Sequence, residues 1–165
     1  RIRKTSLLTW LSLLALCALS ICSAETILPE PSPACESAAG RQVLLTAGDI
    51  EVVITLNDSQ AAADFTGMLP LELTLIERSS FAKGMRLPRA LSTDEETTRE
   101  YSIGDFGYWD VGAELAIFYD DLHEQTGVPV IPLGRAESGA ETLRDASGTA
   151  RLELLPVQDV EGPDV

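Results

Sequence analysis

The sequence is poor in histidine and in positive charge. It contains one histidine, His123, and 12 Lys and Arg residues against 26 Asp and Glu residues, which gives a formal net charge of −14. A field of this sign repels nucleic acid and anionic membrane surfaces, so we expect neither as a partner. The acidic residues are scattered along the chain, which favours solubility over a cation-binding role. A Ser-His-Asp triad is disfavoured as well, because no Gly-x-Ser-x-Gly motif is present.

Cysteine is equally scarce, and its placement excludes an internal disulfide in the mature chain. Cys17 and Cys22 lie in an uncharged apolar run, residues 7–21 and the positions just after it, which follows the basic start RIRK. Small residues up to Ala24 complete the pattern of a secretory signal peptide, so we expect residues 1–24 to be removed. Cys35 would then have no partner within the chain.

This leader predicts an exported protein, periplasmic or extracellular, with no membrane insertion after cleavage. An uncleaved anchor is the alternative, but the apolar run is shorter than the roughly 20 residues that span a bilayer. A lipid anchor is disfavoured because Leu16 and Ile21 precede the two cysteines where a small residue is expected. Removing the leader would also take away three basic residues and no acidic one, making the chain still more acidic.

The remaining sequence predicts one domain between two irregular ends. Residues 25–40 contain Pro29, Pro31 and Pro33 and predict an extended, flexible tether. Residues 158–165 are acidic, contain Gly and Pro, and are expected to fray. Residues 41–157 are enough for a single closed hydrophobic core.

Within this domain the apolar residues mostly alternate, which is typical of strands with one buried face. The candidate strands cover residues 43–45, 50–56, 71–75, 106–109, 114–119, 130–135 and 149–155. Seven or eight short strands suit a barrel or a sandwich. Residues 60–69 predict a helix that caps one barrel mouth, with N-caps at 57–59 and a stop at Pro70, and residues 140–145 predict a turn or two of helix.

Four motifs follow one another between Val43 and Leu155: TLNDSQAAADFTGMLPLELTL, LPRALST, GDFGYWDVGAELAIFYDD and VIPLGRAESGAETL. In this order they resemble the small bacterial cyclophilin-like fold proteins. The resemblance implies a mainly β fold, a closed eight-stranded cyclophilin-like barrel with one or two short capping helices. It implies no activity, since fold alone does not fix function. The Phe-His-Arg and Gln-Phe-Phe motifs of the cyclophilin prolyl isomerases are missing, so those catalytic residues have no counterparts here.

An isomerase needs little beyond a donor near the prolyl nitrogen and an apolar groove. Arg78 and Arg86 flank Phe81 and Met85, and these three, Arg78, Arg86 and Phe81, are the catalytic candidates. The alternative interpretation is an ordinary loop between strands with solvated basic side chains. We favour this alternative, because two or three suitable residue types within ten positions are weak evidence for a catalytic geometry. His123 with Asp120, Asp121 and Glu124 offers metal-ligand types at a spacing of no known signature, so we expect a solvated loop, no metal and no cofactor.

Five aromatic residues gather in residues 104–121, and strand alternation divides them. Phe106 and Tyr108 share one face, whereas Trp109 points with Gly107 to the other. In the next strand Tyr119 falls on the face opposite Phe118. We expect most of these rings in the core, and we take Tyr108, Trp109 and Tyr119 as the candidates from which an outward ring stacks on a ligand.

The sequence therefore predicts an exported binding or accessory module for an unknown small ligand or peptide. A divergent peptidyl-prolyl cis-trans isomerase is the alternative. No pattern in the sequence predicts an oligomeric state.

Overall fold

Alternating apolar residues form the first hairpin of the domain. In the computed structural model, which describes residues 37–157, strand β1 (Gln42–Ala47) pairs antiparallel with β2 (Ile50–Leu56). Leu45 lies opposite Val52, and both are buried. The turn needs a left-handed residue, which Gly48 supplies with φ of 62°.

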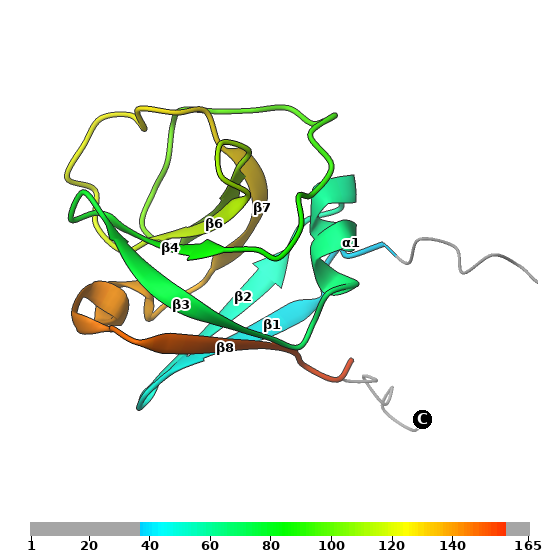
Figure 1. Cartoon of the computed structure of the whole chain (residues 1–165), viewed down its shortest axis with the longest axis horizontal. Coiled ribbons are helices and arrows are strands. Elements are labelled where there is room, and N and C mark those ends of the chain that lie inside the picture. The colour runs from blue at the N-terminus through cyan, green and yellow to red at the C-terminus, as the bar shows by residue number, and fades with distance from the viewer. Residues whose placement is uncertain (1–36, 158–165) are drawn as a thin grey trace, which may run out of the picture. The chain divides into compact units, whose positions relative to one another are not determined.

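Six further strands close this hairpin into a barrel, seen in Figure 1. Their order around the barrel is β1-β2-β7-β5-β6-β4-β3-β8. The bounds are Leu71–Arg78 for β3, Ala82–Arg86 for β4, Asp105–Trp109 for β5, Glu114–Phe118 for β6, Ile131–Ala136 for β7 and Thr149–Leu154 for β8. All neighbouring pairs are antiparallel. The predicted closed eight-stranded barrel is confirmed.

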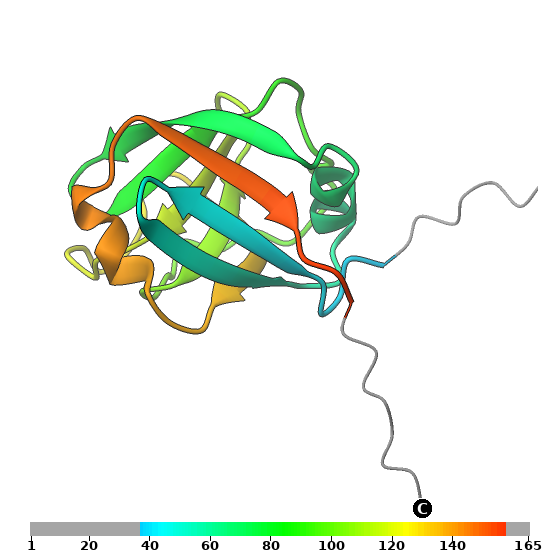
Figure 2. The ribbon, with the colours of Figure 1, turned by 90° about the horizontal axis from the view of Figure 1, so that it is seen from below.

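Two short helices lie at opposite ends of the barrel, as Figure 2 shows. Helix α1 (Gln60–Thr66) begins after Ser59, whose hydroxyl accepts the Ala62 amide at 3.1 Å. The sequence predicted this helix to Leu69, but it ends at Thr66, with Gly67 as the C-cap. The 3₁₀ helix η1 (Ala140–Asp145) covers the other end, where a turn or two of helix was predicted.

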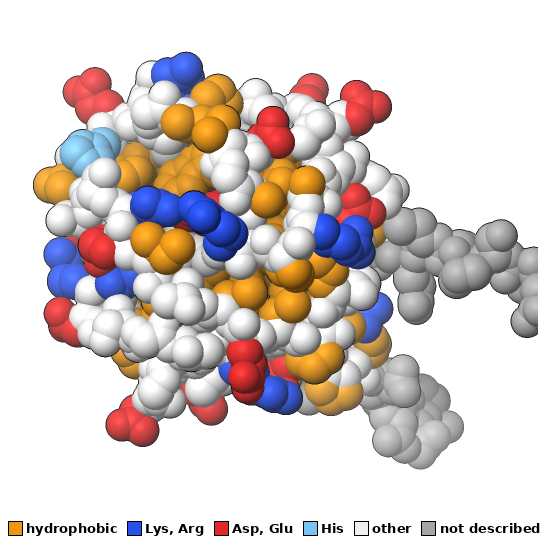
Figure 3. All heavy atoms as spheres, in the orientation of Figure 1, with side chains coloured by type: hydrophobic (Ala, Val, Ile, Leu, Met, Phe, Trp, Pro, Cys, Tyr) orange, Lys and Arg blue, Asp and Glu red, His pale blue; other side chains and the backbone are white. Residues whose placement is uncertain are grey.

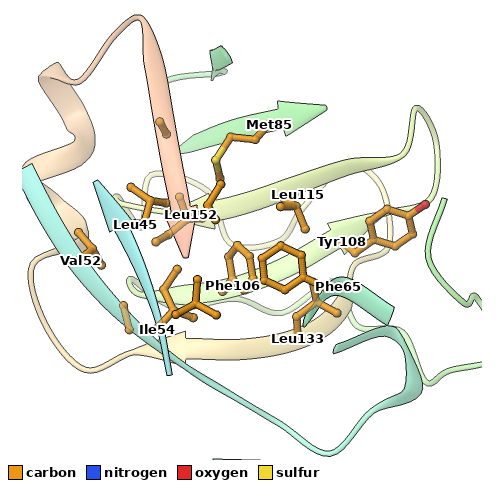
Figure 4. Close-up of a cluster of buried hydrophobic side chains, with 14 of the residues drawn as sticks. Leu45, Val52, Ile54, Phe65, Met85, Phe106, Tyr108, Leu115, Leu133 and Leu152 are labelled. Carbon is orange, nitrogen blue, oxygen red and sulfur yellow. The ribbon is translucent and has the colours of Figure 1, made fainter. Parts of the chain in front are cut away.

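The barrel interior is filled by the inward residues of each strand. Figure 4 shows Phe65 of α1 beside Phe106 of β5, with ring centroids 5.5 Å apart. Tyr108 is fully buried and its hydroxyl accepts the Leu91 amide at 3.3 Å. The predicted alternation is confirmed, because Phe106 and Tyr108 point inward and Trp109 points outward.

Strand β4 (Ala82–Arg86) lies where the sequence patterns favoured a loop between strands. Its five residues pair with β3 on one side and with β6 on the other. Lys83, which lies between the candidates Phe81 and Arg86, is buried there and is not a solvated base. The sequence of β4 lacks the apolar–polar alternation of a strand. Its outward positions Ala82 and Gly84 are small and covered, and its inward side carries a lysine.

The predicted leader at 1–24, most of the tether at 25–40 and the tail at 158–165 lie outside the described residues. Packing already begins at Ala38, which is buried, and the Gly40 amide donates to the Leu56 carbonyl. Among residues 37–157, neither helix has the length and apolar character needed to cross a membrane.

Candidate functional site

A second apolar cluster lies on the outer face of the barrel, over β4 and β6. Phe81 and Phe118 stack with ring centroids 5.6 Å apart, and Trp109 meets Phe118 edge-on at 5.9 Å. Small residues, Ala82 and Ala116, form the floor between these rings. Figure 3 views the molecule from this side and shows apolar side chains gathered over β4 and β6 with cationic side chains beside them.

Two long loops, 87–104 and 119–130, partly cover this face. Tyr101 lies on Phe118 with ring centroids 4.6 Å apart, and the His123 imidazole meets Phe81 edge-on at 5.0 Å. The two loops also bind each other, since Thr98 and Val130 exchange both backbone hydrogen bonds. They leave the part of the face nearest the β5–β6 turn open.

That open part is a cavity of about 360 Å³. Its apolar walls are Phe81, Trp109, Val111 and Val128, and its charged groups are Arg78, Arg86 and Glu114. Val111 and Val128 are 76% and 43% exposed, although apolar side chains of this size are usually covered. The volume falls in the range of small-molecule sites, which combine apolar walls with a few polar groups.

Arg78 and Glu114 form a bidentate ion pair in this cavity. Arg78 donates from Nε to Glu114 Oε1 at 2.6 Å and from Nη2 to Oε2 at 2.5 Å. The Glu114 side chain is 4% exposed and that of Arg78 is 37% exposed. The hydrogen bonds that Arg78 donates to Glu114 raise the pKa of Arg78 above its ordinary value, so the guanidinium remains charged.

Gly84 makes this pair possible. Glu114 stands on β6 opposite Arg86 of β4, but its carboxylate extends over Gly84 toward Arg78 on β3. A β-carbon at position 84 would lie 1.9 Å from Glu114 Oε1. Any other residue there would therefore displace the carboxylate.

Arg86 remains exposed at the rim of the cavity. Although Arg86 is the register partner of Glu114, its guanidinium has no hydrogen-bond or carboxylate partner among residues 37–157. In the wall, the indole Nε1 of Trp109 is buried and has no hydrogen-bond partner in the described part of the chain. An unpaired buried donor is costly, at about 1–3 kcal/mol, and is therefore uncommon.

The structure brings together four of the residues proposed from the sequence: Arg78, Phe81, Arg86 and Trp109 all line this cavity. It does not bring Tyr108 or Tyr119 there, because both rings are buried with the barrel core, at 0% and 2% exposure. Of the three aromatic ligand candidates we therefore retain Trp109. Sequence reasoning missed Glu114, Val111 and Val128, and no motif distinguishes them.

Tyr119 belongs to a different polar cluster. Its hydroxyl donates to Glu77 Oε1 at 2.7 Å, and the buried Lys83 donates from Nζ to Glu77 Oε2 at 2.6 Å. Burial, followed by the bond to Glu77, raises the pKa of Tyr119 to about 12. Burial alone would raise the pKa of Glu77, but the bonds from Lys83 and Tyr119 outweigh it and leave that pKa lowered. The Tyr119 hydroxyl therefore keeps its proton and Glu77 stays ionised, which are the states that form these hydrogen bonds.

Two of the residues that offered metal-ligand types, Asp120 and His123, contact other side chains in the structure. The Asp120 carboxylate accepts a hydrogen bond from Arg144 of η1, and His123 packs on Phe81. A separate, open cavity of about 740 Å³ is lined by Glu100, Asp105 and Glu124 together with uncharged polar side chains. No cationic side chain of residues 37–157 lines it, although Arg135 pairs with Asp105 at 2.9 Å.

Comparison with known proteins agrees with the barrel. A model of the Cyclophilin-like family matches residues 45–154. A search of curated proteins finds no match. The solution structure of the hypothetical protein AF2241 from Archaeoglobus fulgidus is similar, with a TM-score of 0.61 and 17% identity over 73% of this chain and 98% of that one.

A second solved structure, that of McbB in complex with tryptophan, has a TM-score of 0.51 and 15% identity. The similarity covers 75% of this chain and 46% of McbB, so this chain corresponds to about half of that protein. At such identities both similarities show the fold alone.

Proposed function

This chain belongs to the cyclophilin-like family, and from that premise we propose that it is an exported binding module whose ligand site is the cavity between Arg78, Phe81, Arg86 and Trp109. One observation carries the proposal. Exposed apolar side chains, an aromatic wall and two arginines converge on a single cavity of small-ligand size on the outer barrel face.

The composition of the cavity favours binding over chemistry. Its one carboxylate, Glu114, is held by Arg78 through both oxygens, and no nucleophilic thiol or histidine lines it. The group that would act as a general base is therefore engaged in an ion pair. McbB, which has a similar barrel, was solved with tryptophan, so a protein that contains this fold can hold a small aromatic molecule.

A divergent prolyl isomerase is the second candidate, and a specific observation favours it. Arg78 and Arg86 both lie beside Phe81 in one cavity, which supplies a guanidinium donor next to an apolar groove. The free Nη1 of Arg78 could donate to a twisted prolyl amide, since only Nε and Nη2 are used by Glu114.

Two measurements on the full chain separate these candidates. The binding module predicts that a saturation-transfer NMR screen of small aromatic compounds yields binders that compete for one site. It also predicts that micromolar protein leaves cis/trans exchange of an Ala-Pro test peptide at its uncatalysed rate. Acceleration that is lost in both Arg78→Ala and Arg86→Ala, with no small-molecule binder, would support the isomerase instead.

A further inference from the structure

We propose that the ligand of this cavity is a small monoanion, an apolar carboxylate whose charge pairs with Arg86 while its aromatic or aliphatic body contacts Trp109 and Val128. This inference rests on the proposed function and adds the chemical class of the ligand. It follows from the charges in the cavity and from the nature of its walls.

The ion pair at the base contributes no net charge. Both oxygens of Glu114 accept from Arg78, at 2.6 and 2.5 Å, and the carboxylate is almost fully buried. Gly84 holds this arrangement, because it lets the carboxylate lie across β4 toward Arg78 and away from Arg86. A ligand therefore meets a cavity floor without net charge, because the Glu114 carboxylate is already paired with Arg78.

Arg86 then supplies the one uncompensated charge of the cavity. It is exposed, it lines the cavity, and it has no acidic partner among residues 37–157. In a chain whose net charge is −14, an unpaired arginine beside an apolar pocket stands out against its surroundings. A guanidinium binds carboxylates through paired, charge-assisted hydrogen bonds, so an anion is its natural partner.

The walls determine the rest of the ligand. Trp109, Phe81, Val111 and Val128 offer aromatic and branched apolar surface, and two of these side chains are left exposed. Covering them removes apolar area from water, which favours an apolar body. A volume of about 360 Å³ suits one ring or a short alkyl chain.

The other large cavity of the described domain gives the opposite prediction. Glu100, Asp105 and Glu124 line it, and only Asp105 has a cationic partner, Arg135 at 2.9 Å. The other two carboxylates have no ion pair in the described part of the chain, so this cavity repels anions. An anionic ligand is therefore directed to the Arg86 cavity by charge as well as by shape. A cationic ligand would show the reverse preference.

Calorimetric titration of the full chain with three probes of the same ring tests the inference. The probes are phenylacetate, phenylacetamide and 2-phenylethylammonium, which are anionic, neutral and cationic. We expect phenylacetate to bind at least about tenfold more tightly than the amide, as charge-assisted pairing adds to the same apolar contact. Arg86→Gln should reduce phenylacetate to the affinity of the amide, and Arg86→Lys should retain part of the difference.

Arg89→Gln is the matched control, because Arg89 is an exposed arginine three residues further on that does not line the cavity. It should leave all three affinities unchanged. Equal binding of phenylacetate and phenylacetamide, tighter binding of the cation, or a preference that survives Arg86→Gln would each overturn the ligand class while leaving a ligand-binding cavity. If none of the three probes binds, the proposed function fails together with the inference.

Discussion

Replacing Gly84 with alanine is expected to separate Arg78 from Glu114 and to weaken ligand binding in the cavity by at least about tenfold. The added β-carbon would lie 1.9 Å from Glu114 Oε1 and 2.8 Å from its carboxyl carbon. These atoms belong to a side chain that can move, so the barrel can still close. The displaced carboxylate, however, loses both hydrogen bonds to Arg78 and enters the space that the ligand needs.

The same substitution should lower the free energy of unfolding by about 1–2 kcal/mol, because Glu114 is buried but Arg78 is partly exposed and solvent offsets part of the loss. Urea unfolding and calorimetric titration with phenylacetate measure the two effects. Gly127→Ala is the control, since Gly127 also lines the cavity and a β-carbon there would meet nothing within 4 Å. A Gly84→Ala protein with the stability and affinity of the wild type would contradict the geometry described for this pair.

Glu114→Gln separates the charge from the steric effect. It keeps the side-chain shape over Gly84 but leaves Arg78 without a counter-charge. The cavity then holds two uncompensated arginines, so phenylacetate should bind more tightly than to the wild type, in contrast to the loss in Gly84→Ala.

Glu77→Ala is expected to destabilise the barrel by about 3 kcal/mol or more, because it leaves the ammonium of Lys83 buried without its carboxylate. The Lys83 side chain is 6% exposed, and its remaining contact is with the Tyr119 ring, 5.4 Å from Nζ to the centroid. The double variant Glu77→Ala/Lys83→Met should recover most of the loss, since a methionine can fill the same buried space.

Glu72 provides the matched control on the same strand. Its carboxylate is 67% exposed and meets Arg151 at 3.4 Å, so Glu72→Ala should change stability by about 1 kcal/mol or less. Urea unfolding of the four proteins gives the comparison. Equal losses in Glu77→Ala and Glu72→Ala would show that the buried lysine does not depend on Glu77.

The pH dependence of stability should report the same cluster. The pKa of Glu77 is lowered in the fold from its ordinary 4.5, so its contribution is present above about pH 4.5 and is lost as the pH falls through the lowered value. The pKa of Tyr119 is raised from 10.0 to about 12, so its contribution is present below pH 10 and is lost as the pH rises toward 12. In a plot of the free energy of unfolding against pH, Glu77→Ala should flatten the fall at acid pH and reduce the fall at alkaline pH.

Local sequence patterns predicted most of the barrel because its strands alternate. Val52 and Ile54 are buried between exposed neighbours, and the same period places Tyr108 inside and Trp109 outside. The pattern identifies which residues share a face. It does not tell whether the outward face of a strand is also covered. Of the three candidate rings, Tyr108 and Trp109 of β5 and Tyr119 just after β6, the structure therefore retains only Trp109 in the cavity.

The rest depended on contacts between residues far apart in the chain. Arg78 and Glu114 are 36 positions apart and meet only because β3, β4 and β6 are neighbours in the barrel. Strand β4 was missed because Gly84 and Lys83 break the apolar alternation for reasons that lie on other strands, the carboxylates of Glu114 and Glu77. Propensity carries no information about such partners.

The central claim is that a small ligand binds in the cavity between Arg86, Phe81 and Trp109, and amide mapping by two-dimensional ¹H–¹⁵N NMR tests it most directly. Titration with phenylacetate should shift the backbone signals of Phe81, Arg86 and Val128 and the indole N–H signal of Trp109, and leave Glu100 and Glu124 in place. Shifts confined to the acidic cavity around Glu100 and Glu124, or no shifts at all, would contradict it.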